Sequence, residues 1–92
     1  MEKIGMGRSV HTPAYRALLD TLIEAREAAG LTQTELAIRL GATQSFVSKC
    51  ERGERRLDVV EFVDFAKAIG RNPQTVFATF LRNVSTPTGR DV

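Results

Sequence analysis

The sequence predicts an all-α domain of five helices. Apolar residues recur at helical spacing along the chain, and helix-capping residues with glycine stops divide it into five segments. No stretch of useful length alternates with the two-residue period of a strand. A chain of 92 residues has material for a single core. We therefore expect one domain over residues 12–83, between a flexible arm at 1–11 and a flexible tail at 84–92.

The first helix is expected over residues 13–29. Thr12 can cap its first amides, Pro13 presets the backbone at the first helical position, and Gly30 supplies a left-handed stop. Its apolar residues recur at helical spacing, so they are expected in the core. These residues are Tyr15, Leu18, Leu19, Leu22 and Ile23.

Two short helices are expected next, over residues 33–40 and 44–52. Thr32 and Glu35 form a capping box at the start of the first, and Thr43 caps the second. Gly41 between them can adopt a positive φ without steric cost. The turn is therefore only about three residues long, a length typical of helix pairs that cross steeply.

The last two helices are expected over 59–69 and from residue 73 onward. Asp58 caps the fourth helix with Glu61 at its third position, and Asn72 with Pro73 repeats the start seen at the first helix. The expected buried stripe of the fourth helix is Val59, Phe62, Val63, Ala66 and Ile69. The apolar face of the fifth helix is expected to belong to the core, to a dimer interface or to both. It comprises Val76, Phe77, Phe80 and Leu81.

The helix pair at residues 33–53 carries the strongest functional signal. Five residues are expected to face the rest of the bundle, and Ala37 lies where the two axes pass closest. The inward residues are Leu36, Leu40, Ala42, Val47 and Cys50. The outward residues of the second helix of the pair are Gln44, Ser45, Ser48, Lys49 and Arg52. A helix presented in this way fits the major groove of DNA.

The outward residues have side chains suited to DNA. Glutamine pairs with adenine through two hydrogen bonds, lysine donates to guanine, and serine serves either base. The candidates for base contact are Gln44, Ser45, Ser48 and Lys49. The candidates for phosphate contact are Gln33, Arg52, Arg55 and Arg56. The alternative is that these side chains are ordinary solvent-exposed surface residues. This alternative has more weight for any single residue than for the motif as a whole.

Residues 31–53, and more loosely 13–81, resemble the phage-repressor and Cro-like helix-turn-helix family, also called the XRE family. The pieces that carry the resemblance are Gly30-Leu31-Thr32-Gln33, Glu35-Leu36-Ala37, Leu40-Gly41 and Gln44-Ser45-Phe46-Val47-Ser48-Lys49 running into Glu51-Arg52-Gly53. The resemblance implies a five-helix lambda-repressor-like DNA-binding domain.

Residue roles also follow from the resemblance. It implies base contacts by Gln44, Ser45 and Lys49, phosphate contacts by Gln33, Thr43 and Arg52, and a structural ion pair between Arg26 and Glu51. Two residues depart from the family pattern. Phe46 is expected to touch a thymine methyl or a sugar rather than fill the core. Cys50 is expected to be a small core residue.

The expected function is that of a sequence-specific DNA-binding transcriptional regulator. We expect a repressor that binds a palindromic operator in double-stranded DNA as a homodimer. The alternative is an antitoxin or other protein-binding regulator that uses the same domain to hold a partner such as a toxin. A net charge of +2 is compatible with a polyanionic partner but decides little.

Several other classes of function are not expected. One cysteine, Cys50, and one histidine, His11, exclude an internal disulfide and leave no cluster for a transition metal. The sequence offers no paired nucleophile and base, so an enzyme is not expected, and no cofactor is expected either. No apolar run is long enough to cross a bilayer, and a cytoplasmic protein is expected.

Overall fold

The protein is an all-α bundle of five helices in the part of the chain that the structure, a computed structural model, describes: residues 12–85. The bounds are α1 Pro13–Ala28, α2 Gln33–Leu40, α3 Gln44–Glu51, α4 Val59–Ile69 and α5 Pro73–Ser85. The domain boundary expected at residue 83 therefore falls inside α5. The arm expected at 1–11, and residues 86–92 of the tail, lie outside the described residues.

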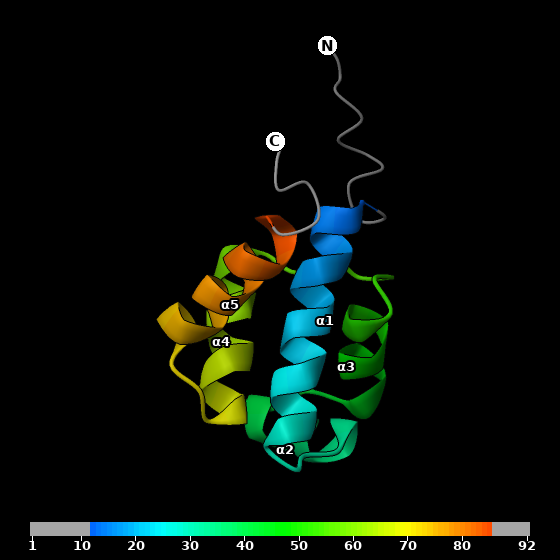
Figure 1. Ribbon diagram of the computed structural model, residues 1–92. Coiled ribbons are helices and arrows are strands. Elements are labelled where there is room, and N and C mark those ends of the chain that lie inside the picture. The colour runs from blue at the N-terminus through cyan, green and yellow to red at the C-terminus, as the bar shows by residue number, and fades with distance from the viewer. Residues whose placement is uncertain (1–11, 86–92) are drawn as a thin grey trace.

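The long helix α1 lies at the centre of the bundle (Figure 1). In that view α4 and α5 lie on one side of α1, α3 lies on the other, and α2 lies at the bottom end. The helix pair α2 and α3 packs together, α2 also packs against α4, and α1 packs against α3, α4 and α5. The helix pair is thus supported from behind by α1 and α4.

Side-chain caps start the helices where the sequence predicted them. Thr12, Thr32, Thr43 and Asp58 each accept a hydrogen bond from the backbone N–H three residues later, at 2.7 to 3.1 Å. The Asn72 side chain accepts one from the amide two residues later, at 2.8 Å. Such caps satisfy amides that have no partner inside the helix. They are local interactions, which is why the sequence alone predicted the helix starts.

The turn between α2 and α3 depends on Gly41 and Ala37. Gly41 has a φ of 69°, a left-handed conformation that disfavours residues with a Cβ atom. The Ala42 N–H then donates to the Ala37 carbonyl at 2.9 Å, which closes the end of α2. Ala37 itself is 2% exposed, so a small side chain occupies the place where α2 packs closely.

Two helix ends differ slightly from those predicted. The first helix ends at Ala28 rather than Ala29, and the third ends at Glu51 rather than Arg52. Ala29 and Arg52 are C-caps with ψ near zero, each followed by a glycine with positive φ. The chain leaves the helix one residue before the glycine because the last turn is already distorted there.

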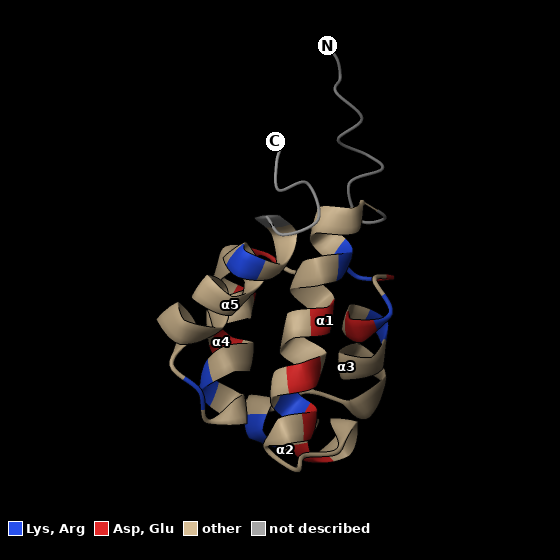
Figure 2. Ribbon diagram, viewed as in Figure 1, with Lys and Arg blue, Asp and Glu red and all other residues tan. Residues whose placement is uncertain are grey.

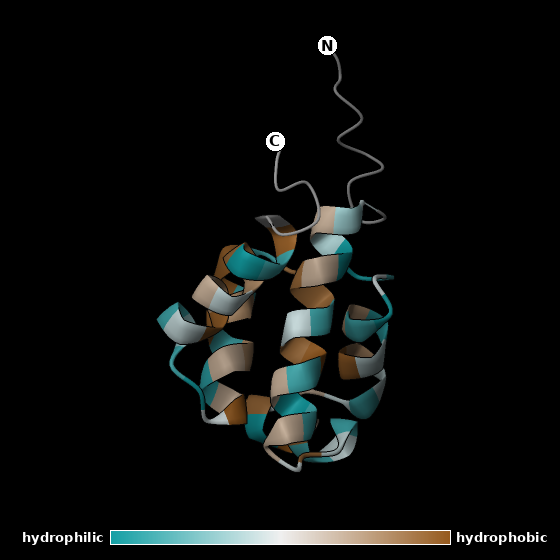
Figure 3. Cartoon of the chain, in the orientation of Figure 1, coloured by the Kyte–Doolittle hydropathy of each residue, from teal (hydrophilic) through white to brown (hydrophobic). Residues whose placement is uncertain are grey.

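The core is shared by all five helices and excludes Val59 and the half-buried Ile23, which were both predicted to be in it. Val59 is 79% exposed, whereas Phe65, which was not predicted to be in the core, is 2% exposed. Val59 is the first residue of α4, and helical side chains point toward the N-terminus, so its side chain projects beyond the bundle. Val63 is only half-buried. Figure 3 shows that apolar and polar residues share every helix, as amphipathic packing requires.

Candidate nucleic-acid interface

Helix α3 presents a polar face and is held by an apolar one. Val47 and Cys50 are 0% exposed, so they anchor the inner face of the helix in the core. Gln44, Ser45 and Lys49 are exposed, and Ser48 is half-buried. The residues predicted to contact bases therefore lie together on the outer face of α3 and in its first turn.

A buried ion pair ties the end of α3 to α1. Arg26 is 9% exposed and Glu51 is 8% exposed. The Arg26 Nε donates to Glu51 Oε2 at 2.7 Å, and its Nη2 donates to Oε1 at 3.0 Å. The remaining nitrogen of Arg26, Nη1, donates to the carbonyl of Leu31 at 2.7 Å. The guanidinium thus joins α1, the segment just before α2 and the end of α3 at one point.

The same carboxylate is connected to the surface through two glutamines. The Gln33 Nε2 donates to Glu51 Oε1 at 2.8 Å, and the Gln44 Nε2 donates to Gln33 Oε1 at 2.7 Å. Gln33 is half-buried and Gln44 is exposed. A continuous series of hydrogen bonds therefore runs from buried Arg26 through Glu51 and Gln33 to Gln44, the first residue of α3. Gln33, predicted to contact phosphate, is its third member.

Arg52, predicted to contact phosphate, is already paired within the protein. Its Nε and Nη2 donate to the Glu54 carboxylate at 2.8 and 3.1 Å, and its Nη1 contacts the Ser48 hydroxyl. The hydrogen bonds with Arg52 lower the pKa of Glu54, and those with Glu54 raise the pKa of Arg52. A phosphate that approaches Arg52 must therefore compete with Glu54.

Arg55 also has an internal partner. The Arg55 Nη2 lies 2.8 Å from Glu61 Oε2, and its guanidinium carbon lies 5.0 Å from the centre of the Phe46 ring. The hydrogen bonds from Arg55 are the main reason that the pKa of Glu61 is lowered. These contacts fix the loop after α3 to the start of α4.

Arg56 lies over an aromatic ring of α1. Its guanidinium carbon is 4.6 Å from the centre of the Tyr15 ring, and the Tyr15 hydroxyl accepts a hydrogen bond from the buried Leu57 amide at 2.8 Å. The loop that carries Arg55 and Arg56 is therefore held in place before any ligand arrives.

Two further residues of the helix pair have structural roles. The Thr43 hydroxyl, predicted near phosphate, accepts from the Phe46 amide at 3.0 Å. Phe46 was expected to touch DNA rather than fill the core, and in the structure it is half-buried and packs against the core without belonging to it. The centre of its ring lies 6.2 Å from the centre of the Phe65 ring of α4.

Lys49 differs from the arginines around it. Within residues 12–85 its ammonium group has no ion pair or side-chain hydrogen bond, and it is exposed in the last turn of α3. Figure 2 shows further basic residues, all arginines, in the loop that follows α3. This end of the helix pair therefore offers positive charge, to which Lys49 contributes without an ion-pair partner among the described residues.

The contact between Gln33 and Gln44 was not predicted from the sequence. The sequence did indicate that each glutamine is the first residue of its helix. Both glutamines therefore lie at helix N-termini, and these two ends lie on the same side of the helix pair. Their meeting depends on the crossing of α2 and α3, which the spacing alone does not define.

No group of three or more metal-ligating side chains occurs in residues 12–85. The same residues contain no helix long and apolar enough to cross a membrane. Cys50 is 0% exposed, and burial raises the pKa of its thiol, as expected for a small core residue.

Comparisons with known proteins agree with this geometry. Residues 17–80 match the family model described as a helix-turn-helix domain. The chain belongs to the XRE family of helix-turn-helix proteins. The structure is similar to that of an XRE-family like protein from Pseudomonas syringae pv. tomato str. DC3000, with 53% identity and a TM-score of 0.75. The match covers 88% of this chain and 96% of that chain. The comparison with curated proteins gives no match.

Membership of the XRE family gives the function in general terms. The XRE-family domain is a DNA-binding helix-turn-helix, and this protein is a transcription regulator in that general sense. Regulatory folds of this kind are typically not enzymes. The exposed face of α3 is the part of this XRE-family domain whose shape and chemistry suit the major groove.

Proposed function

We propose that this XRE-family protein is a sequence-specific repressor that acts in the cytoplasm and binds a palindromic operator as a homodimer. In this proposal α3 enters the major groove, and Gln44, Ser45, Ser48 and Lys49 contact base edges. Bound protein blocks access of RNA polymerase to the promoter. Half-sites related by the two-fold axis lie about 34 Å apart on one face of the duplex.

The observation that carries the proposal is the fixed position of Gln44. Flexible glutamine side chains lose rotamer entropy when they bind, so an exposed glutamine held in advance is suited to contact a base. Here the Gln44 amide is held at 2.7 Å by Gln33, which is itself held at 2.8 Å by buried Glu51. A glutamine that only formed part of the solvent-exposed surface would not require these two hydrogen bonds.

The phosphate contacts are proposed for Gln33, Thr43, Arg52, Arg55 and Arg56, at the helix N-termini and in the loop after α3. Arg52 and Arg55 exchange carboxylate partners for phosphate partners in this proposal, since Glu54 and Glu61 hold them in the free protein. Lys49 needs no exchange and is expected to contribute strongly to the salt dependence.

The test is a comparison of two variants on the operator and on random DNA. A selection from a random duplex library first identifies the operator. Gln44→Ala should then cost about 1 to 3 kcal/mol on the operator and relax the preference at one base pair. Arg52→Ala should weaken binding to all sequences alike and reduce the salt slope by about one. Equal losses on operator and random DNA for Gln44→Ala would refute its role in base recognition.

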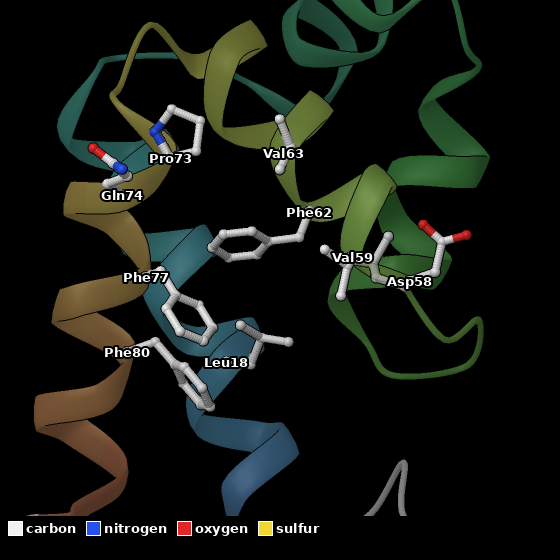
Figure 4. A pocket seen from close by; sticks show the side chains of 10 residues that line it. Leu18, Asp58, Val59, Phe62, Val63, Pro73, Gln74, Phe77 and Phe80 are labelled. Atoms are coloured by element: carbon white, nitrogen blue, oxygen red, sulfur yellow. The ribbon is translucent and has the colours of Figure 1, made fainter.

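An apolar groove supports the homodimer part of the proposal. It lies between α4, α5 and α1, has a volume of 390 Å³ and is lined mainly by apolar side chains. Figure 4 shows Phe62 of α4 and Phe77 of α5 pointing toward each other across it, with Leu18 of α1 beside them. Phe77 is 45% exposed and Val59, at its edge, 79% exposed. Apolar area of this kind is commonly covered by another chain.

This face can be occupied while α3 is bound to DNA, because it lies on the other side of α1 from α3 (Figure 1). Val59→Ser and Phe77→Ser together should therefore produce a monomer in analytical ultracentrifugation and reduce binding to the full palindrome more than to a half-site. Ile38→Ser is the matched control, since Ile38 is 72% exposed on α2, outside the groove. A wild-type protein that is monomeric with or without operator DNA would contradict the homodimer.

A further inference from the structure

Glu54 places a negative charge within the basic end of the helix pair. Its two carboxylate oxygens accept hydrogen bonds from Arg52, from Nε at 2.8 Å and from Nη2 at 3.1 Å. These hydrogen bonds are the largest of the effects that lower the pKa of Glu54, and the charge of Lys49 acts in the same direction. A guanidinium group binds a phosphate through two parallel hydrogen bonds of the same kind. In the free protein Glu54 therefore occupies two of the nitrogens that Arg52 would offer to a DNA phosphate.

The backbone of the loop after α3 keeps Glu54 beside Arg52. The Glu54 amide donates to the Lys49 carbonyl at 2.9 Å, and Gly53 before it has a φ of 80°. Because only Gly53 separates the two charged residues, their pairing brings no distant parts of the chain together. The contacts that fix the loop belong to the main chain, so a change of the Glu54 side chain leaves them in place.

Among residues 12–85, the Glu54 carboxylate accepts hydrogen bonds from Arg52 alone. Glu61, the partner of Arg55, differs in this respect, because its carboxylate also accepts from the Asp58 amide at 2.9 Å and so helps to cap α4. Glu54 has no such part in the start of a helix. Its effect on Arg52 can therefore be tested without disturbing the fold.

We infer that Glu54 is an internal competitor of DNA phosphate, which lowers the affinity of Arg52 for every DNA sequence alike. When a phosphate takes the Arg52 nitrogens, the Glu54 carboxylate loses its partner and is left beside a second anion. Phosphates have the same chemistry at every base pair, so this competition is independent of sequence. The inference rests on the phosphate contact of Arg52 in the proposed function.

The expected effect is modest, because the pair is exposed. The side chains of Arg52 and Glu54 are 53% and 55% exposed, and exposed ion pairs are weak. A phosphate that displaces Glu54 therefore binds about two- to fivefold less tightly than it would to an unpaired arginine. The salt dependence is also lower, because an arginine neutralised in advance contributes less to counterion release. Base contacts then supply a larger share of the binding free energy.

The test is a double-mutant cycle between Glu54 and Arg52. Glu54→Gln keeps the length of the side chain and removes its charge, and Arg52→Ala removes the proposed phosphate contact. Glu24→Gln is the matched control, since Glu24 is exposed and lines a small groove between α1 and α5, on the opposite side of α1 from α3. Full-length wild type, the three variants and the double variant are titrated with operator and with random duplex DNA at several salt concentrations. Thermal unfolding of each protein verifies the fold.

Glu54→Gln should raise the affinity for operator and for random DNA by the same factor, about two- to fivefold, and should steepen the salt dependence. Glu24→Gln makes the same change in net charge and should have a much smaller effect. In the Arg52→Ala background, Glu54→Gln should add no more than Glu24→Gln does in wild type, because the competition requires Arg52.

Two kinds of result would overturn the competitor role. If Glu54→Gln changes the affinity no more than Glu24→Gln does, or lowers it, Glu54 does not compete with phosphate. If the gain is the same with and without Arg52, the charge of Glu54 repels DNA directly, and a role through Arg52 is refuted.

The outcomes also separate this inference from the proposed function. If Arg52→Ala binds as wild type does while Gln44→Ala still relaxes one base pair, the inference fails and the proposed base recognition stands. If wild type enriches no sequence from the random library, the sequence-specific function fails. A gain on random DNA that depends on Arg52 would still support the competitor role in that case.

Discussion

Replacement of Arg26 by alanine is the most direct test of how the fold is held together. Glu51 is 8% exposed and accepts two hydrogen bonds from Arg26, at 2.7 and 3.0 Å. In Arg26→Ala the carboxylate stays buried without its counter-charge, and the Leu31 carbonyl loses its donor as well. Removal of one member of a buried pair typically costs about 3 to 5 kcal/mol.

That loss is large for a domain of this size. Small domains have unfolding free energies of about 5 to 15 kcal/mol, and each lost kcal/mol lowers the melting temperature by about 4 to 8 °C. Arg26→Ala should therefore lower the melting temperature by at least about 12 °C, measured by circular dichroism at 222 nm. The wavelength reports helix content, which is high in a five-helix protein.

The control is an ion pair of the same helix that is exposed to solvent. Asp20 lies 3.1 Å from Arg16, one helical turn away, and their side chains are 55% and 44% exposed. Asp20→Ala should cost only about 0.3 to 0.5 kcal/mol, because water screens the pair. An Arg26→Ala melting curve that coincides with that of wild type would show that Glu51 finds other compensation and would refute the reasoning from burial.

Three further predictions concern packing, pH and thiol reactivity. Leu36→Ala, at a side chain that is 0% exposed, should cost about 2 to 5 kcal/mol in chemical denaturation, whereas Ile38→Ala, at 72% exposed, should leave the midpoint nearly unchanged. Because Arg55 lowers the pKa of Glu61 from its ordinary 4.5, that carboxylate stabilises the fold above pH 4.5 and stops doing so as the pH falls through its lowered pKa. Melting temperature measured from pH 7 to 3 should therefore fall less in Glu61→Gln than in wild type. Cys50, buried and with a raised pKa, should react with iodoacetamide only after denaturation; rapid labelling of folded protein would contradict its place in the core.

Helix positions were predictable from the sequence because their determinants are local. The caps Thr32, Thr43 and Asp58 lie within a few residues of the amides they bind, and α2 and α4 have the predicted bounds. Exposure at a helix end was less predictable. Val59 has helical spacing to the core residues of α4, but its burial depends on whether a neighbouring helix reaches that far, which the sequence does not reveal.

The candidate site shows the same division between local and non-local information. The outward face of α3 follows from helical periodicity, so the exposure of Gln44 and Lys49 was predictable. The arginine partners were not, because Glu54 and Glu61 reach Arg52 and Arg55 only through the conformation of the loop after α3. The sequence made Arg52 and Arg55 candidates for phosphate contact, whereas the structure shows each of them paired with a carboxylate of the protein.

The position of Glu51 links the stability of the domain to its recognition of DNA. One oxygen of its carboxylate accepts from both Arg26 and Gln33, at 3.0 and 2.8 Å, so a change at that atom affects the core and the surface together. If Gln44 reads a base, substitutions that weaken the ion pair should also disturb its orientation, even though Arg26 lies behind the surface that faces DNA. Loss of sequence preference in such a variant then does not by itself place the substituted residue at the interface. A substitution of Gln33 separates the two roles. Gln33 connects Glu51 to Gln44 but takes no part in the two hydrogen bonds between Arg26 and Glu51.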